Sequence, residues 1–212
     1  MAEEQSATST RDKILASGMR YFSEYGFKSA PLREIVKDAG YTLGAFYGYY
    51  KTKEELFYAL TEETALGFTA IVRSIGSDMD KLPPDKMIYS MVDCYIARLP
   101  ELVDYICTHK AAFTLLLRGA EGTKYENFMD TFRTKNLSHV AEAKDKAVQT
   151  GDAMSALDPQ LFNLLMQGYF DMLARIVLEI EDAERICRMM RDVALVYKNG
   201  MLSLMKGADN YE

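Results

Sequence analysis

Apolar residues recur at intervals of three and four positions along most of the chain, and this spacing predicts helices. No stretch alternates between apolar and polar residues for long enough to predict a strand. We therefore expect an all-α fold. The predicted helices cover residues 10–25, 32–50 (two short helices), 52–75, 85–99, 101–107, 110–118, 125–150, 159–180 and 183–205.

The segment 32–53 is predicted to form two short helices joined by a tight turn. The first helix has a buried face formed by Leu32, Ile35, Val36 and Ala39. Gly40 follows where a helix C-cap needs a positive φ, and the Thr42 hydroxyl can cap the next helix. In that second helix Phe46 and Tyr50 are four residues apart and form the inward pair.

The outward face of the second helix has the composition of a DNA-contacting surface rather than of a solvent-exposed one. It consists of Leu43, Gly44, Ala45, Tyr47, Gly48 and Tyr49. Two aromatic hydroxyls and two glycines beside Lys51 and Lys53 can meet groove edges and backbone phosphates. The pattern predicts a helix-turn-helix whose second helix enters the major groove. An ordinary pair of core helices is the alternative.

From Thr10 onward the sequence resembles the amino-terminal domain of the TetR family of transcriptional regulators. The resemblance rests on ILxxxxxxFxxxGF, REIxxxAG and GxFYxYYKxKEEL, and it covers about a quarter of the chain. It implies a three-helix DNA-binding domain at 10–56 after a disordered tail at 1–9. The helix at 52–75 would lead into a helical effector-binding and dimerisation domain at 76–212.

The resemblance also assigns the residues that contact DNA. It implies phosphate contacts from Thr42, Tyr47, Tyr49 and Lys53. It places Leu43, Gly44, Ala45 and Gly48 against base edges, with Arg33 reaching either. The expected partner is a palindromic double-stranded operator, and the expected function is repression relieved by a small molecule.

Two residues depart from the family pattern. Leu43 stands where relatives often carry a polar base reader, although it could contact a thymine methyl group. Pro31 stands where relatives often carry Ser or Thr. These departures keep a second hypothesis open, namely a helical ligand-binding or scaffold protein of the same fold that has lost specific DNA binding.

The charge distribution favours DNA binding at one end of the chain. The net charge is −6, but residues 10–53 contain eight Lys/Arg and four acidic residues, so this segment carries +4 and the rest −10. Attraction for phosphate is therefore concentrated in the predicted helix-turn-helix region.

Composition indicates a globular cytoplasmic protein. Hydrophobic residues make up 49% of the 212 positions and charged residues 26%. No apolar run reaches the roughly 20 residues of a membrane span, and the polar start is unlike a signal peptide. The three cysteines form no CxxC pair, and we expect reduced thiols.

The last two predicted helices indicate a homodimer. In 159–180 the polar residues Asn163, Gln167, Asp171 and Arg175 fall every fourth position, and most other positions are apolar. Such a helix must be covered on more than one side. The TetR resemblance implies a four-helix dimer interface, for which the candidates are Leu161, Leu165, Met172, Ile176, Ile186, Met190 and Val193. An internal helix of a monomer is the alternative.

The resemblance further implies a pocket for a small, largely apolar effector. Its candidate lining is Met87, Met91, Tyr95, Phe113, Leu116, Phe128, Phe132, Phe162, Met166 and Tyr169. Flexible methionine side chains can line a pocket that adapts to its ligand. The alternative is that these residues form an ordinary hydrophobic core, since apolar residues at helical spacing usually do.

Enzyme signatures are missing from the sequence. Neither His109 nor His139 has a Glu three residues before it, and no HExxH, GxSxG, P-loop or GxGxxG occurs. Cys107 and His109 point to different faces of a helix, which argues against a metal site. We expect no enzymatic activity, no cofactor and no metal.

Overall fold

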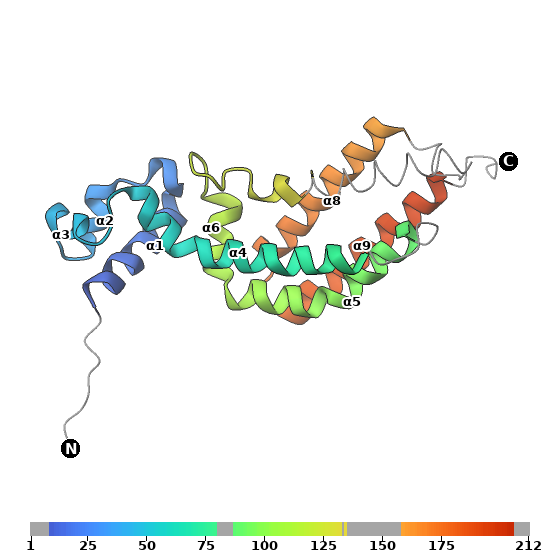
Figure 1. Ribbon diagram of the computed structural model, residues 1–212, viewed down its shortest axis with the longest axis horizontal. Coiled ribbons are helices and arrows are strands. Elements are labelled where there is room, and N and C mark those ends of the chain that lie inside the picture. The colour runs from blue at the N-terminus through green and yellow to red at the C-terminus, as the bar shows by residue number, and fades with distance from the viewer. Residues whose placement is uncertain (1–8, 80–86, 133, 135–157, 206–212) are drawn as a thin grey trace, which may run out of the picture. The chain divides into compact units, whose positions relative to one another are not determined.

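The computed structural model describes residues 9–79, 87–132, 134 and 158–205, and every regular element in these ranges is a helix (Figure 1). The predicted all-α fold is confirmed. The helices are α1 (Thr10–Ser29), α2 (Leu32–Asp38), α3 (Leu43–Tyr47), α4 (Lys53–Met79), α5 (Met87–Thr108), α6 (Lys110–Arg118), α8 (Pro159–Glu179) and α9 (Ala183–Met205). Residues 1–8 of the predicted tail at 1–9 and most of the predicted helix at 125–150 lie outside the described residues, whereas Ser9 is described.

The chain divides into two compact units. Unit 1 contains the residues up to Gly67 together with His109–Phe128, and unit 2 contains Phe68–Thr108 and the residues from Met129 onward. Helix α4 therefore contributes to both units. The sequence assigned residues 109–128 to the carboxy-terminal domain, whereas the structure packs them with the amino-terminal helices.

Helix α1 begins at Thr10, the first residue of the predicted helix, and its N-cap is the residue before it. The N-cap is Ser9, whose hydroxyl accepts from the Asp12 N–H at 3.2 Å, while the Asp12 carboxylate accepts from the Ser9 N–H at 3.2 Å. This reciprocal capping box satisfies two N–H groups that the first turn cannot pair. At the other end Gly26 has a φ of 72°, which breaks the helix where the sequence predicted its end.

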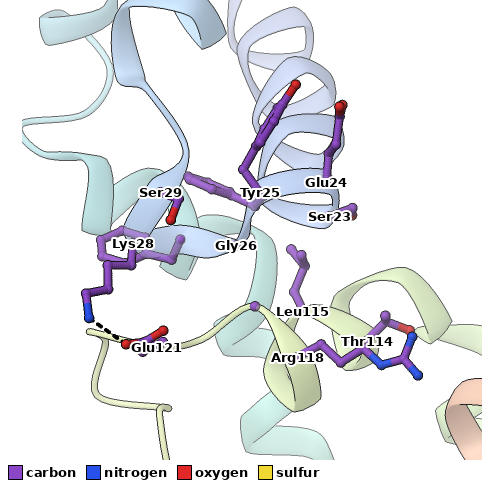
Figure 2. Close-up of a pocket in the computed structure, with 13 residues that line it drawn as sticks. Ser23, Glu24, Tyr25, Gly26, Lys28, Ser29, Thr114, Leu115, Arg118 and Glu121 are labelled. Atoms are coloured by element: carbon purple, nitrogen blue, oxygen red, sulfur yellow. Dashed lines mark hydrogen bonds and ion pairs between the residues drawn. The ribbon is translucent and has the colours of Figure 1, made fainter.

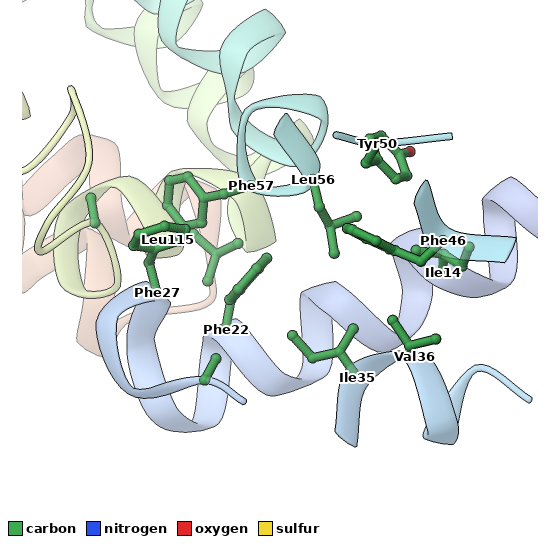
Figure 3. Close-up of a cluster of buried hydrophobic side chains, with 12 residues drawn as sticks. Ile14, Phe22, Phe27, Ile35, Val36, Phe46, Tyr50, Leu56, Phe57 and Leu115 are labelled. Atoms are coloured by element: carbon green, nitrogen blue, oxygen red, sulfur yellow. The ribbon is translucent and has the colours of Figure 1, made fainter. Parts of the chain in front are cut away.

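An aromatic cluster forms the core of unit 1 (Figure 3). The Phe57 ring lies 5.3 Å, centroid to centroid, from both Phe22 and Phe27 in edge-on packing. Leu115 of α6 is buried in the same cluster. Burying one such side chain contributes about 1.5–3 kcal/mol, so this cluster fixes where α1, α4 and α6 meet.

Helix α5 of unit 2 corrects one sequence expectation. The sequence predicted separate helices at 85–99 and 101–107, but α5 runs unbroken from Met87 to Thr108 with Pro100 inside it. Pro100 is exposed, whereas the nearby Leu99, Leu102 and Val103 are buried. Packing of this apolar face outweighs the helix-breaking cost of proline.

Helices α8 and α9 pack on each other and α9 also packs on α5. Tyr169 of α8 and Tyr197 of α9 have ring centroids 5.0 Å apart. Lys198 of α9 donates to the Asp93 carboxylate of α5 at 2.6 and 2.7 Å. These contacts hold the three helices together within unit 2.

Much of α8 remains uncovered within the chain. Leu161, Leu164 and Met172 are 40%, 60% and 41% exposed. By length and composition alone, residues Gln160–Glu179 would be long and apolar enough to cross a membrane, with a mean hydropathy of 1.2 and 11% of that stretch buried. One such helix is weak evidence for a membrane span, because the core helix of a soluble protein can have the same length and composition.

Candidate nucleic-acid interface

The turn between α2 and α3 has the geometry that the sequence predicted. Gly40 has a φ of 83°, and its N–H donates to the Lys37 carbonyl at 2.9 Å. The Tyr41 N–H donates to the Val36 carbonyl at 3.0 Å, which closes the end of α2. The Thr42 hydroxyl then accepts from the Ala45 N–H at 3.3 Å and caps α3. The glycine C-cap and the threonine N-cap are both confirmed.

A polar contact ties α2 to α1. The buried Ser17 hydroxyl is bonded to the Ile35 carbonyl at 2.8 Å and to the Asp38 carboxylate. Arg20 of α1 forms an ion pair with the same carboxylate. Because the Ser17 side chain is fully enclosed, loss of these bonds would leave a buried polar group unpaired. The contact therefore fixes the orientation of α2 and the turn that follows it.

Helix α3 buries one aromatic residue and exposes the rest of its surface. Phe46 is fully buried, and Tyr50 just beyond the helix is 6% exposed, which confirms the inward pair. On the other side Tyr47 and Tyr49 are 55% and 50% exposed. The outward face also includes the exposed Gly44 and Gly48 and the half-buried Leu43 and Ala45.

Lys53 at the start of α4 is bonded within the chain. Its Nζ donates to the carbonyl oxygens of Phe27 at 2.7 Å, Ala30 at 3.0 Å and Lys28 at 3.3 Å. It also lies 4.6 Å from the centroid of the Phe27 ring. Burial lowers the pKa of Lys53 from its ordinary value. The ammonium group thus caps the carbonyl groups at the end of α1, a role that its position in the sequence motif does not reveal.

Ion pairs occupy other basic residues of the amino-terminal segment. Lys28 pairs with Glu121 at 2.5 Å, and Lys37 lies 3.9 Å from Glu34. In the described part of the chain no ion pair involves Arg33 or Lys51, both of which are exposed. Arg33 on α2 and Lys51 before α4 are therefore exposed cations that no ion pair occupies in the described part of the chain.

A cavity of about 370 Å³ lies in unit 1 beside the end of α1 and the end of α6 (Figure 2). Its lining includes Gly26, Lys28, Arg118 and Glu121, and the Lys28–Glu121 pair spans one side of it. None of the residues predicted to line the effector pocket lines this cavity. It is a polar recess around the contact in which the Phe27 N–H donates to the Gly119 carbonyl at 2.8 Å.

The residues predicted for an effector pocket are divided between the units. Phe113, Leu116 and Phe128 belong to unit 1 and are buried there. The members that belong to unit 2 are Met87, Met91, Tyr95, Phe132, Phe162, Met166 and Tyr169. The side chains of Met87 and Met91 lie outside the described residues. Burial raises the pKa of Tyr169, and its ring packs on Tyr197.

The residues predicted for the dimer interface also fall into two groups. Ile176, Ile186 and Met190 are 5%, 0% and 4% exposed, so they pack within the chain. Leu161 and Met172 are exposed, and Leu165 and Val193 are half-buried. Three exposed apolar residues, Leu164, Leu195 and Val196, were not among the residues predicted for the interface.

The geometry of α2, the turn and α3 defines a helix-turn-helix domain. Residues 14–60 match the sequence model of the "Bacterial regulatory proteins, tetR family". The amino-terminal domain thus matches the TetR family. The three motifs from which the sequence suggested the family lie in or directly around the matched residues.

Curated relatives are similar over the same domain. The HTH-type transcriptional regulator AcrR of Shigella flexneri is 45% identical over 58 residues, 27% of this chain and 27% of the relative. The HTH-type transcriptional repressor AcnR of Corynebacterium glutamicum is 33% identical over 69 residues, 32% of this chain and 37% of the relative. The matches thus span only about a quarter to somewhat over a third of these relatives.

Solved structures are similar over nearly the whole chain. A member of the TetR transcriptional regulator family from Streptomyces coelicolor A3 has a TM-score of 0.60 at 18% identity, covering 94% of this chain and 93% of that one. A TetR-like transcriptional regulator from Rhodococcus sp. RHA1 has a TM-score of 0.56 at 18% identity, covering 92% and 98%. At these identities the likeness concerns the fold.

Proposed function

We propose that the chain is a transcriptional regulator that binds an inverted-repeat DNA operator through α3 and represses transcription in the cytoplasm. The observation that carries this proposal is that α3 buries Phe46 and leaves Gly44 and Tyr47 exposed, with Tyr49 exposed just beyond its end. Helices that only support a core do not normally present glycines and tyrosines on their solvent side. The same face is suited to enter a major groove.

Residues around α3 provide the contacts that would hold the protein on the duplex. Tyr47 and Tyr49 offer exposed hydroxyls, while Arg33 and Lys51 offer exposed cations. Phosphate contacts from such groups fix the register of the protein on DNA without reading its sequence. Lys53 stabilises the DNA-binding unit itself, since its ammonium group donates to the carbonyl oxygens of Phe27 and Ala30.

We further propose that the regulator is a homodimer. Exposed apolar residues gather on the last two helices, with Leu164 of α8 60% exposed and Val196 of α9 69% exposed. Covering these faces with a second copy would remove apolar surface from water at about 25 cal/mol per Å². A two-fold dimer also provides the pair of α3 helices that an inverted repeat requires.

An effector would act by favouring one of two conformations. Helix α4 supplies residues to both units, with Lys53 at one end and the stretch from Phe68 in unit 2. A small, largely apolar molecule that binds in unit 2 can lower operator affinity only by its differential affinity for the two conformations, typically about 1–3 kcal/mol. DNA must then weaken effector binding by the same factor. Titrating a compound found by thermal shift, with and without operator, tests this equality.

A direct test of DNA reading is fluorescence anisotropy with the DNA upstream of the protein's own gene and with unrelated duplex. We expect the upstream DNA to bind at least about 1,000-fold more tightly at physiological salt. Equal affinity for both would favour the second hypothesis, a helical ligand-binding or scaffold protein without specific DNA binding. The internal bonding of Lys53 and the apolar Leu43 are the two observations that support that alternative.

A further inference from the structure

The face of α3 that would meet bases has almost no hydrogen-bonding side chains. Leu43, Gly44, Ala45 and Gly48 carry no side-chain nitrogen or oxygen. The nearby Thr42 hydroxyl is engaged as the acceptor of the Ala45 N–H. The usual direct readers of guanine and adenine, namely Arg, Lys, Asn and Gln, do not occur anywhere in α3.

Apolar contact is the form of base readout that such a face can provide. In the major groove the thymine C5-methyl group is the apolar feature that distinguishes one base from the others. Leu43 is the first residue of α3, and the amino-terminal residues of a recognition helix are those that contact base edges. Its side chain is half-buried, so one part packs on the core and the rest remains free to contact a base.

The glycine beside Leu43 permits a close approach. A Cβ atom added at Gly44 would meet only the Thr42 Oγ1 atom, at 3.7 Å, and φ there is not positive. The fold therefore does not require glycine at this exposed position. A small residue here leaves space outside the helix, so that the backbone of α3 can lie deep in the groove and bring Leu43 and Ala45 to the methyl groups.

From these observations we infer that α3 reads its half-site through thymine methyl groups, with Leu43 as the main specificity-determining residue and Ala45 beside it. This inference rests on the proposed function and names the chemistry of its DNA partner. The half-site would carry thymine at the base pairs that face α3. Arg33 lies on α2, so a guanine contact from Arg33 would add to this readout at a different base pair.

The test begins with in-vitro selection of duplexes from a random library with the full chain. The enriched inverted repeat is then synthesised with deoxyuridine in place of single thymines, because deoxyuridine pairs like thymidine and lacks only the methyl group. Loss of one buried methyl contact should weaken binding about fourfold, and loss of one in each half-site about 15-fold. Deoxyuridine at thymines outside the repeat is the matched control and should change affinity less than about twofold.

A variant of the protein identifies the residue that contacts the methyl group. Leu43→Ala removes the apolar side chain, so the deoxyuridine effect at its base pair should fall from about fourfold to below about twofold. The deoxyuridine comparison with the wild-type protein needs no variant and tests the inference even if Leu43→Ala fails to fold.

The outcomes separate this inference from the proposed function. If an inverted repeat is enriched but its affinity stays the same when each thymine is replaced by deoxyuridine, the methyl readout is overturned and specific DNA binding stands. A repeat that lacks thymine in its half-sites would do the same. If no sequence is enriched, both the specific DNA binding and the methyl readout are overturned.

Discussion

The Nζ atom of Lys53 lies 2.7 Å from the carbonyl oxygen of Phe27 and 4.6 Å from the centroid of its ring. One side chain at the start of α4 therefore holds both the backbone and the aromatic ring at the end of α1. Phe27 in turn packs on Phe57 of α4. Lys53 is thus a structural residue of the DNA-binding unit, whatever it also contributes to binding.

Lys53→Met should destabilise the protein. The substitution keeps an unbranched apolar side chain but removes the donor to three carbonyl groups. We expect the free energy of unfolding to fall by about 1–3 kcal/mol, measured by urea denaturation. Lys51→Met, which alters an exposed lysine two residues away, should stay within about 0.5 kcal/mol of the wild type. Equal stability of the two variants would contradict the structural role of Lys53.

Lys51→Met should act instead on DNA binding. Because the Lys51 side chain is exposed and makes no ion pair in the described part of the chain, its charge is available for phosphate. Affinity for operator and for unrelated DNA should fall together. The slope of log affinity against log salt concentration should become shallower by about one. An unchanged slope would mean that Lys51 does not contact DNA.

Tyr50→Phe should stabilise unit 1. Among the described residues the Tyr50 hydroxyl is a buried oxygen without a hydrogen-bond partner. Burial raises the pKa of Tyr50, and the nearby Arg11 guanidinium opposes that rise without reaching hydrogen-bond geometry with the hydroxyl. Removing an unpaired buried hydroxyl should increase the free energy of unfolding by about 1 kcal/mol. Tyr49→Phe, at a half-exposed site, should leave stability unchanged, and a loss of stability in Tyr50→Phe would show that the hydroxyl has a partner.

Leu164→Asp and Val196→Asp should convert the proposed dimer into monomers. Both residues are exposed in the single chain, so the substitutions should not disturb its folding. In a dimer each would bury a charge without a partner. Sedimentation velocity measures the outcome, with Leu66→Asp on α4 as a control because Leu66 is 62% exposed outside the proposed interface. A wild-type monomer at micromolar concentration would refute the dimer.

Local patterns predicted the helix-turn-helix well, because its determinants are local. Gly40 and Thr42 act within a few residues of themselves, and Phe46 and Tyr50 follow simple helical spacing. Helices α6, α8 and α9 were predicted to within a residue at each end for the same reason. The capping box of Ser9 and Asp12 is also a local pattern, although the sequence prediction did not include it.

Long-range contacts could not be predicted in this way. Periodicity shows that Ile186 and Met190 are covered, but it does not show that the chain itself covers them. Residues 109–128 join unit 1 through the buried Leu115 and through the bond between the Phe27 N–H and the Gly119 carbonyl, and neither contact follows from a local sequence pattern. Lys53 matches a family motif, but its three carbonyl partners can be identified only from the position of the end of α1 in the folded structure.

The most direct measurement of the central claim is the affinity of Gly44→Glu for the DNA upstream of the gene. A Cβ atom at this exposed position meets only the Thr42 hydroxyl oxygen, at 3.7 Å, so the fold should persist. A carboxylate on the outward face of α3 would face the phosphate-lined groove, and we expect affinity to fall by at least about 100-fold. Ala111→Glu places the same charge on α6 and should bind like the wild type. If Gly44→Glu folds normally and binds the upstream DNA as tightly as the wild type, α3 is not the surface that reads DNA.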